Sequence, residues 1–570
     1  MRYFLSILIL FFLCSDLTAK PAIISDKEIF SPVIAKNGMV ATSDPSASEI
    51  GLNILKKGGN AVDAAVTAGF VMAVTFPRAG NIGGGGFMLI HSAGTGEVVS
   101  IDYREKAPAA SYRDMFLDKD GKVDTSLSRG SHLSAGVPGT VAGLTTALKK
   151  YGTISLKEAL APAIDLAENG FTVTTRISDA VKKGYNRLKR WNSSRKIFLK
   201  SDGSFYEPGE RFVQKDLAKT LRKIAEGGAS AFYDGEISAL IVKEMKEGGG
   251  IISRADLRAY RPVIRKPVKG TYRGYDIYSM SPPSSGGTHI IQILNILEGY
   301  DIRSMGHNSA AAIHLMSEAM KRAYADRSRY LGDPDFTDVP VPELTSKKYA
   351  AKIRRQIDIS KASLSKDIMP GAISFNESNE TTHFSVVDKN GNAVSNTYTL
   401  NFSFGSGIVV DGAGFLLNNE MDDFSAKPGE PNAYGLTGGA ANAIEPDKRM
   451  LSSMAPTIVL KDKKPFLVTG SPGGSRIITT VVQVIMNVID HGMNVQEAVN
   501  APRIHHQWFP DEIRIEKGIS PDTIEILKSK GHKISLKRTM GAASSILIDN
   551  FNRDLFGASD PRRKGLAAGY

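Results

Sequence analysis

The chain has 570 residues, of which 42% are hydrophobic and 23% charged, and its formal net charge is +12. These proportions are those of a folded globular protein and exclude a disordered or collagen-like chain. Nearly all of the excess positive charge lies before residue 381, and part of it is a run of basic residues over 182–200. We interpret this run as a solvated helix-loop face, because a nucleic-acid site would need more such patches.

The first residues have the pattern of a secretory signal peptide. Met1-Arg2 precede an almost wholly apolar run, Tyr3 to Cys14, and a cleavage point follows Ala19. The run is too short to span a membrane, and no later segment holds ~18 uninterrupted apolar residues. We therefore expect residues 1–19 to be removed and the mature protein to be exported, periplasmic or secreted, without stable membrane insertion. A lipoprotein signal at Cys14 is a weaker alternative, because Leu13 is large where a small residue is needed.

Cys14 is the only cysteine, so the mature chain would have no disulfide and no thiol nucleophile. His505 and His506 have no acidic or thiol partner at ligand spacing, and we interpret them as packing or supporting residues. We predict no metal site and no cofactor.

The periodicity of apolar residues indicates a layered fold. Helices are predicted over 47–57 and 60–75, followed by a glycine-rich stretch at 80–86 and strands at 87–91 and 101–104. A dinucleotide fingerprint needs strand, glycines and helix in that order, so these glycines are expected to allow close backbone packing or to line a pocket. Residues 140–370 indicate mainly helices. The later segments predicted are strands at 381–388, 393–401, 407–411, 414–417, 456–460 and 465–469, and a helix over 475–491. Runs of strands with helices grouped outside them favour an α/β layered sandwich.

Residues 381–401 predict a β-hairpin that begins abruptly after a polar run ending at Glu380. Asn390-Gly391 supplies the turn signal. With that turn, Thr381 lies opposite Thr399 or Leu400, and Asn401 follows just beyond. Opposed threonines also stabilise sheets, which is the structural alternative to a chemical role.

A threonine hydroxyl becomes a nucleophile only beside a base. Without cysteine, the candidates are a His/Asp pair or the α-amine of the threonine itself, which exists only if the chain is cut before it. A free α-amine has a pKa of ~7.7–8.0 and can act as a base near neutral pH. Cleavage after Glu380 would give Thr381 such an amine.

A second stretch offers a site for negative charge. A predicted strand ends at Gly470, and Ser471-Pro-Gly473-Gly474-Ser475 leads into a helix. Consecutive N–H groups at such a turn could bind phosphate or form an oxyanion hole, but the Lys-Ser/Thr of a P-loop is missing.

Six separated motifs of the sequence resemble those of a known enzyme family. TTHFSVVDKNGNAVSNTYTLN, GFLLNNEMDDFS, RMLSSMAPTIV, GSPGGSRIITT, AGNIGGGGF and DYREKAP together closely resemble the bacterial γ-glutamyltranspeptidases, N-terminal-nucleophile hydrolases, over about residues 35–570. The resemblance implies a four-layer αββα sandwich and an inactive precursor. Self-cleavage between Glu380 and Thr381 would give a large subunit, 20–380, and a small catalytic subunit, 381–570.

The resemblance also implies the reaction. The Thr381 hydroxyl would attack the γ-carbonyl of glutathione or another γ-glutamyl compound, and the γ-glutamyl group would pass to water or to an amino acid or dipeptide amine. The implied roles of the remaining residues are as follows: Arg104, Ser452 and Ser453 for the substrate α-carboxylate; Asn401, Glu420 and Asp423 for its α-ammonium; Gly473 and Gly474 for the oxyanion hole; Thr399 for the Thr381 amine; and Tyr434 for a lid.

Two positions depart from the family pattern. Met450 stands where many relatives have proline, and Glu420 stands where some have glutamine, which could tighten ammonium binding. Three alternatives stay open: a related acylase, a poly-γ-glutamate processing enzyme, and a non-catalytic secreted binding protein with this fold. The first two need not share a site for both an α-carboxylate and an α-ammonium.

Overall fold

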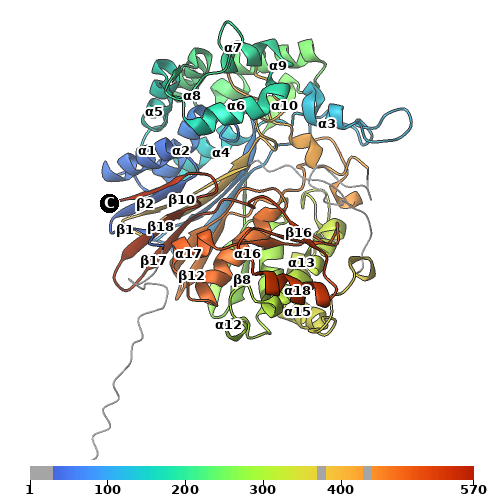
Figure 1. The fold of residues 1–570 in the computed structure, drawn as a ribbon. Coiled ribbons are helices and arrows are strands. Elements are labelled where there is room, and N and C mark those ends of the chain that lie inside the picture. Colours follow the sequence, from blue (N-terminus) through green and yellow to red (C-terminus); the bar gives the residue numbers. More distant parts are fainter. Residues whose placement is uncertain (1–29, 369–380, 428–438) are drawn as a thin grey trace, which may run out of the picture.

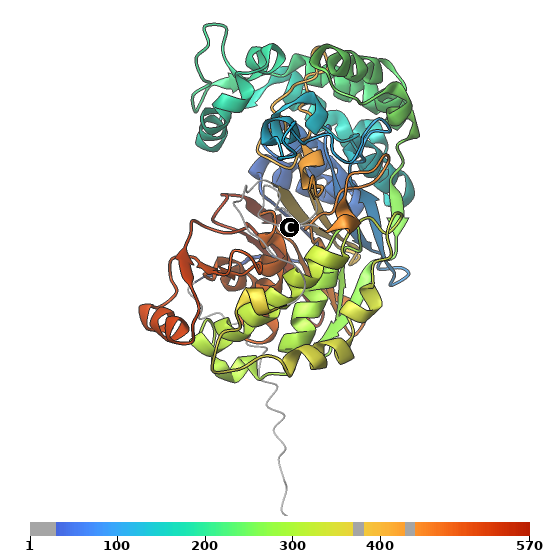
Figure 2. The same ribbon diagram turned by 90° about the vertical axis from the view of Figure 1, so that its right-hand side faces the viewer.

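The computed structural model describes residues 30–368, 381–427 and 439–570. Residues 1–19, Glu380 and Tyr434, for which the sequence predicts a signal peptide, a cleavage site and a lid, lie outside the described residues. Two seven-stranded sheets form the centre of the molecule, and helices cover both outer faces (Figure 1). The turned view in Figure 2 shows the same helical layers above and below the sheets. The predicted αββα sandwich is therefore confirmed.

Within each large sheet, every neighbouring pair of strands is antiparallel. In spatial order, the first sheet consists of β1 (Val33–Ala35), β18 (Asp554–Ser559), β17 (Ser544–Asp549), β13 (Lys464–Thr469), β12 (Thr457–Lys461), β9 (Tyr275–Ser279) and β8 (Val268–Tyr272). The second consists of β19 (Leu566–Gly569), β2 (Gly38–Thr42), β10 (Thr382–Asp388), β11 (Ala393–Thr399), β3 (Gly85–His91), β4 (Val98–Tyr103) and β7 (Val263–Arg265). Two small sheets contain β14 (Ile504–His505), β15 (Ile513–Ile515) and β16 (Ile534–Leu536), and β5 (Phe171–Thr172) and β6 (Arg211–Phe212).

The helices divide between the two outer faces (Figure 1). Those on the side of the second sheet are α1 (Pro45–Lys56), α2 (Ala61–Thr75), α3 (Thr125–Gly130), α4 (Thr140–Tyr151), α5 (Leu156–Asn169), α6 (Thr175–Leu188), α7 (Asn192–Phe198), α8 (Lys215–Tyr233), α9 (Glu236–Gly248) and α10 (Arg254–Ala259). Those on the side of the first sheet are α11 (Gly286–Leu297), α12 (Ile302–Met305), α13 (Ala310–Tyr330), α14 (Val341–Leu344), α15 (Lys347–Arg354), α16 (Arg476–Ile489), α17 (Val495–Asn500) and α18 (Pro521–Ser529).

Alternation along the strands divides the core into layers. On β3, Phe87 and Leu89 belong to the apolar cluster that includes the first sheet, whereas Met88 and Ile90 belong to the cluster under α1, α2 and α4. Side chains of a strand point alternately to opposite faces, so both faces of this strand are covered. The second sheet is therefore buried between two hydrophobic layers.

The first predicted helices are confirmed as α1 and α2, and their ends have local causes. At the start of α2, the Asn60 side chain accepts from Val62 and Asp63, while Asp63 accepts from the Asn60 N–H. This capping box satisfies N–H groups that have no partner within the helix. All residues of α2 are buried, which explains why its apolar residues surround the whole helix.

Two expectations about strands were wrong. Residues 407–411 and 414–417 form only one isolated bridge, between Val409 and Leu416, because positive φ angles at Gly412 and Gly414 turn the chain sharply between them. The helical interpretation of 140–370 also missed β5, β6, β7, β8 and β9. These strands are short and lie at or near the edges of the sheets, where their sequence pattern is weak.

The hairpin register places Thr381 opposite Thr399. β10 and β11 pair Thr382 with Tyr398, and continuation by one residue brings the two threonines together. The Asp388 N–H donates to the Asn392 carbonyl at 3.1 Å, so a three-residue loop, 389–391, connects the strands, with Gly391 at φ 86°. The Asp388 side chain accepts from the N–H groups of Asn390 and Asn392. A three-residue loop with glycine in the left-handed region fixes this register and not the one that pairs Thr381 with Leu400.

Candidate active site

Thr381 is buried at the head of β10, with 4% of its surface exposed. Its hydroxyl lies 3.5 Å from the Thr399 hydroxyl, which also accepts from the Asn401 N–H at 2.8 Å. Arg563 donates to the Thr381 carbonyl oxygen at 2.7 Å. The first residue of the hairpin is thus held on both sides, by β11 and by the segment before β19.

His383 lies on the same face of β10 but is a poor base. Its ring nitrogens contact the hydroxyls of Thr397 at 2.8 Å and Ser385 at 3.1 Å. Burial lowers the pKa of His383 to about 3, because the charged imidazolium is desolvated. The histidine nearest in sequence to Thr381 is therefore neutral at physiological pH and already hydrogen-bonded.

The glycine-rich stretch before β3 positions Thr399. A Cβ atom at Gly84 would lie 2.0 Å from the Thr399 carbonyl oxygen, and one at Gly83 would lie 2.1 Å from the Leu416 carbonyl oxygen. Asn81 donates to the Thr399 carbonyl at 2.9 Å and accepts from the Gly84 N–H at 2.9 Å. Of the two roles expected for these glycines, close backbone packing is confirmed.

One small cavity, of about 20 Å³, brings together most of the residues that the sequence singled out. Its lining consists of Arg104, Arg327, Thr381, Thr399, Glu420, Asp423, Ser452, Ser453, Met454, Gly474, Ser475 and Ile477. These residues come from segments spread over more than half of the chain. Such convergence of polar groups in a concave site is typical of a functional site.

Arg104 forms ion pairs inside this cavity. Its guanidinium donates to Glu420 and Asp423, and also to the Met450 carbonyl at 3.2 Å. Glu105, which the sequence did not indicate, lies 3.7 Å from the same guanidinium. Arg104, Glu105 and Glu420 are almost completely buried. The residues predicted for the two charged ends of a substrate are thus paired with one another.

Three buried carboxyl groups share this guanidinium, and burial raises the pKa of each. Desolvation is the main cause, and Arg104 opposes it. The pKa of Glu105 rises to about 7, and neither of its oxygens has a hydrogen-bond partner among the described residues. The charge beside the Arg104 guanidinium therefore depends on pH in the neutral range.

The serine pair is supported from behind by the loop that precedes α11. The N–H and hydroxyl of Ser285 each donate to the Ser452 carbonyl at 2.8 Å. Arg327, on α13, donates to Ser285 at 2.9 Å and to Ser453 at 3.2 Å. Burial lowers the pKa of Arg327 to about 10, so it remains charged at neutral pH. In the sequence, the basic side chain of Arg327 is the only signal that this residue could take part in the site.

The glycine turn before α16 faces the same cavity. Gly473 and Gly474 have φ angles of 136° and 57°, a region that favours glycine. Within the described residues, neither N–H has a hydrogen-bond acceptor. Gly474 lines the cavity with Thr381. Donors at a turn that opens a helix can stabilise a developing negative charge.

Asn401 lies next to the cavity but is not part of its lining. It has a φ of 75°, and its side-chain amide donates to the Asn419 carbonyl at 3.0 Å. This contact joins the end of the hairpin to the short 3₁₀ helix η4 (Glu420–Asp423), which carries two of the cavity carboxylates. In this structure Asn401 connects these two segments.

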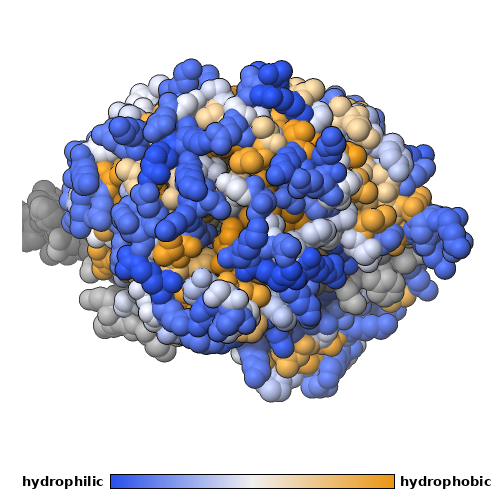
Figure 3. Space-filling view, turned by 90° about the horizontal axis from the view of Figure 1, so that it is seen from above, coloured by the Kyte–Doolittle hydropathy of each residue, from blue (hydrophilic) through white to orange (hydrophobic). Residues whose placement is uncertain are grey.

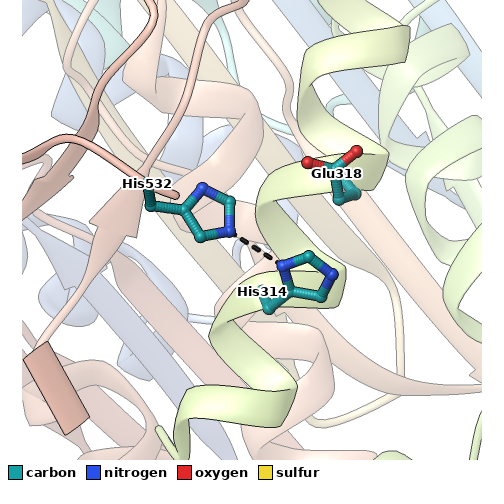
Figure 4. Close-up of side chains that lie close together, drawn as sticks. All are labelled: His314, Glu318 and His532. Carbon is teal, nitrogen blue, oxygen red and sulfur yellow. Dashed lines mark hydrogen bonds between the residues drawn. The ribbon is translucent and has the colours of Figure 1, made fainter. Parts of the chain in front are cut away.

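A second polar cluster lies away from this cavity, between α13 and the residues after α18. His314, Glu318 and His532 place possible ligand atoms within 4.8 Å of one another (Figure 4). Glu318 already accepts from Lys321 at 2.8 Å and Arg322 at 2.6 Å, and His314 contacts the Asp358 carbonyl at 2.8 Å. Two cations neutralise Glu318, the one carboxylate of this three-residue cluster, which disfavours the binding of a metal ion. We interpret the cluster as a structural tie to residues 358–363.

Two stacked antiparallel sheets between helical layers, with a threonine at the head of a central strand, define the class of the N-terminal-nucleophile hydrolases. A family model described as gamma-glutamyltranspeptidase matches residues 47–570. The chain therefore belongs to the γ-glutamyltranspeptidase family.

Individual relatives agree with this assignment. The chain is 56% identical to the glutathione hydrolase proenzyme of Escherichia coli (strain K12), covering 96% of this chain and 94% of the relative. The crystal structure of Helicobacter pylori gamma-glutamyltranspeptidase is 50% identical, with a TM-score of 0.57, over 61% of this chain and 97% of that chain. A cephalosporin acylase structure from Bacillus halodurans is 30% identical, with a TM-score of 0.85, over 96% of this chain and 99% of that chain.

Proposed function

We propose that this chain is a precursor that cleaves itself between Glu380 and Thr381 and then transfers γ-glutamyl groups from glutathione or related compounds to water or to an amine. The observation that carries the proposal is the single cavity in which Thr381 and Thr399 meet Arg104, Asp423 and Gly474. A hydroxyl nucleophile, both signs of charge and an N–H turn converge there. Family membership supports the same activity.

Cleavage begins with attack of the Thr381 hydroxyl on the Glu380 carbonyl carbon. The C–N bond then breaks, and the Glu380 acyl group passes to the Thr381 oxygen as an ester, leaving a free α-amine. Water hydrolyses the ester, so that the large subunit, 20–380, ends in a carboxylate and the small subunit, 381–570, begins at Thr381. The hydrogen bond to Thr399 holds the attacking oxygen in place.

The new α-amine is the best base available to the mature hydroxyl. His383 has a pKa of about 3 and both of its nitrogens already contact hydroxyls. A free α-amine, with a pKa of ~7.7–8.0, can accept the Thr381 proton near neutral pH. This contrast favours the α-amine over a His/Asp pair, the other possibility consistent with the sequence.

The transfer reaction passes through one ester intermediate, which forms in the first step and is broken in the second. The Thr381 oxygen attacks the γ-carbonyl, and the N–H groups of Gly473 and Gly474 stabilise the oxyanion. Removal of one such donor typically costs ~3–4 kcal/mol. The leaving amine, cysteinylglycine in the case of glutathione, takes a proton from the Thr381 ammonium. Water or the amine of an amino acid or dipeptide then attacks the γ-glutamyl ester and restores the enzyme.

Substrate recognition would exchange ion pairs inside the cavity. An α-carboxylate at Arg104, Ser452 and Ser453 would displace a protein carboxylate, and Glu420 or Asp423 would then pair with the α-ammonium. Arg104 holds both carboxylates in the described structure, and the cavity of about 20 Å³ has room for little more than a water molecule. The cavity must therefore widen as the substrate enters. We propose that Asn401 orients η4 during this exchange and that Tyr434 covers the occupied site.

A related acylase is the alternative that the fold allows, because the cephalosporin acylase structure shares most of the chain's architecture. The ion-paired set of Arg104, Glu420 and Asp423 favours a substrate with both an α-carboxylate and an α-ammonium.

No helix among the described residues is long and apolar enough to span a membrane. We further propose that residues 1–19 direct export and that the product is periplasmic or secreted.

Thr381→Ala tests the proposal, and Thr382→Val is its matched control. Thr382 is adjacent and buried, but lies on the other face of β10. We expect Thr381→Ala to remain a single band on a denaturing gel and to release no glutamate from glutathione, while Thr382→Val cleaves and retains activity. Cleavage of Thr381→Ala would overturn the self-cleavage mechanism.

A further inference from the structure

A larger cavity, of about 620 Å³, lies between α3, α6 and the residues that follow the hairpin. Its volume is in the range of small-molecule sites. The cationic residues in its lining are Arg78, Arg129, Lys183, Arg187 and Arg190. None of the described residues that line it is acidic. Four of these five residues come from α3, α6 and the turn after α6, on the hydrophilic upper side of the molecule seen in Figure 3.

Among the described residues, acidic groups neutralise only part of the positive charge of this cavity. Arg129 lies 3.3 Å from Asp422, and Arg187 donates to the carbonyl oxygens of Ser403 and Gly405 at 3.1 and 2.7 Å. Across the described part of the chain, Lys183 and Arg190 form no ion pair within 4 Å. A concave site lined by one sign of charge concentrates counter-ions. Among the described residues, Lys183 and Arg190 thus place positive charge without an ion-pair partner at a cavity of ligand size.

Phe402 gives the cavity an apolar wall as well. Its ring lies 4.9 Å from the Arg187 guanidinium and 6.0 Å from that of Arg129. These contacts hold two guanidinium groups in place before a ligand arrives, which lowers the entropic cost of binding. An anion with a short carbon chain would meet both fixed donors and apolar surface.

We propose that this cavity is a second ligand site, which binds a small anion carrying two or more carboxylate or phosphate groups. Guanidinium groups bind both kinds of oxyanion through paired N–H donors, so the chemistry that they share defines the ligand class. The site is separate from the Thr381 cavity, with which it shares no lining residue in the described part of the chain. The two sites are neighbours in the sequence, because Phe402 follows Asn401, and Asp422, the partner of Arg129, precedes Asp423.

Isothermal titration of the purified protein tests this site. The probes are tri-L-glutamate with ordinary α-peptide bonds, which has no γ-glutamyl bond to cleave, and inorganic tripolyphosphate. We expect at least one probe to bind with a Kd below about 1 mM at low salt, and more weakly at higher ionic strength. The probe that binds more tightly identifies the carboxylate or the phosphate source.

The lining variant is Lys183→Glu with Arg190→Glu, and the matched control is Lys149→Glu with Lys189→Glu. All four side chains are exposed, so both pairs should fold, and both change the net charge equally. We expect the lining pair to weaken binding at least ten-fold and the control pair less than two-fold. The proposal is overturned if neither probe binds, or if the control pair weakens binding as much as the lining pair. Lys183→Gln and Arg190→Gln, tested singly, give the same readout should the double variant fail to fold.

Discussion

Arg104 donates to Glu420 and Asp423 and lies 3.7 Å from Glu105, so one guanidinium faces three buried carboxyl groups. Truncating it to alanine would leave those groups without their cation, and breaking a buried pair in this way typically costs ~3–5 kcal/mol. Loss of stability would then hide any effect on substrate binding. A test of its role at the residue scale must keep the positive charge.

Arg104→Lys is the appropriate change. Lysine keeps the charge but loses the fork that can hold a carboxylate through two N–H groups. We expect the variant to cleave, and its KM for a γ-glutamyl substrate to rise at least ten-fold with a smaller change in kcat, as measured by steady-state kinetics. Arg176→Lys, at a buried pair with Asp44 outside the candidate site, is the control. An unchanged KM in Arg104→Lys would exclude Arg104 as the carboxylate anchor.

Glu105 predicts a pH effect on stability. Its pKa in the folded protein, about 7, is above its ordinary value of 4.5, so between these values the folded state holds a proton that the unfolded state has lost. Stability contributed by this group is complete below pH 4.5, falls by ~1.4 kcal/mol per pH unit as the pH rises, and is lost above pH 7. Glu105→Gln lacks this dependence.

The measurement is the Tm of Glu105→Gln against its parent from pH 5 to 8, both in the uncleaved Thr381→Ala background. We expect the variant to gain Tm relative to the parent up to about pH 7, where the pKa of Glu105 lies, and then to keep a constant difference. A difference that does not change with pH would show that Glu105 does not titrate in this range.

At the scale of elements, the geometry of the site depends on how closely β3 approaches β11. The backbone at Gly84 leaves no room for a side chain, since a Cβ atom there would lie 2.0 Å from the Thr399 carbonyl oxygen. Overpacking of this kind typically costs ~1–3 kcal/mol. It would also move Thr399, the partner of the Thr381 hydroxyl.

We therefore expect Gly84→Ala to lower Tm and to slow the appearance of the cleaved product in a time course on denaturing gels. Gly94→Ala is the control, because a Cβ atom at Gly94 has nothing within 4 Å. That variant should change stability by less than ~0.5 kcal/mol and cleave normally. Cleavage of Gly84→Ala at the normal rate would mean that the exact position of Thr399 is unimportant.

Local patterns predicted the elements that carry the nucleophile, but not the contacts that surround it. The Asn390-Gly391 turn and the alternation of β10 and β11 were enough to bring Thr381 near Thr399. Arg327 reaches the cavity only through tertiary packing, which no spacing in the chain encodes. The same is true of the His314–His532 contact, whose partners are 218 residues apart.

At the scale of the whole molecule, both sheets combine strands from the two sides of the proposed cleavage point. β1, β8 and β9 precede it in the first sheet, whereas β12, β13, β17 and β18 follow it. In the second sheet, β10 and β11 lie between β2 and β3. Neither fragment can leave without breaking both sheets. The fragments should therefore co-elute in size-exclusion chromatography and separate only in denaturant; elution of separate folded fragments would contradict this expectation.

The central claim is that Thr381 becomes a new N-terminus. Intact-mass measurement of the purified protein, with N-terminal sequencing of the smaller fragment, tests it most directly. We predict two fragments divided between Glu380 and Thr381, with the smaller one beginning Thr-Thr-His-Phe. A protein that stays in one piece, or a small fragment that begins at Thr382 or at any other residue, would contradict the account.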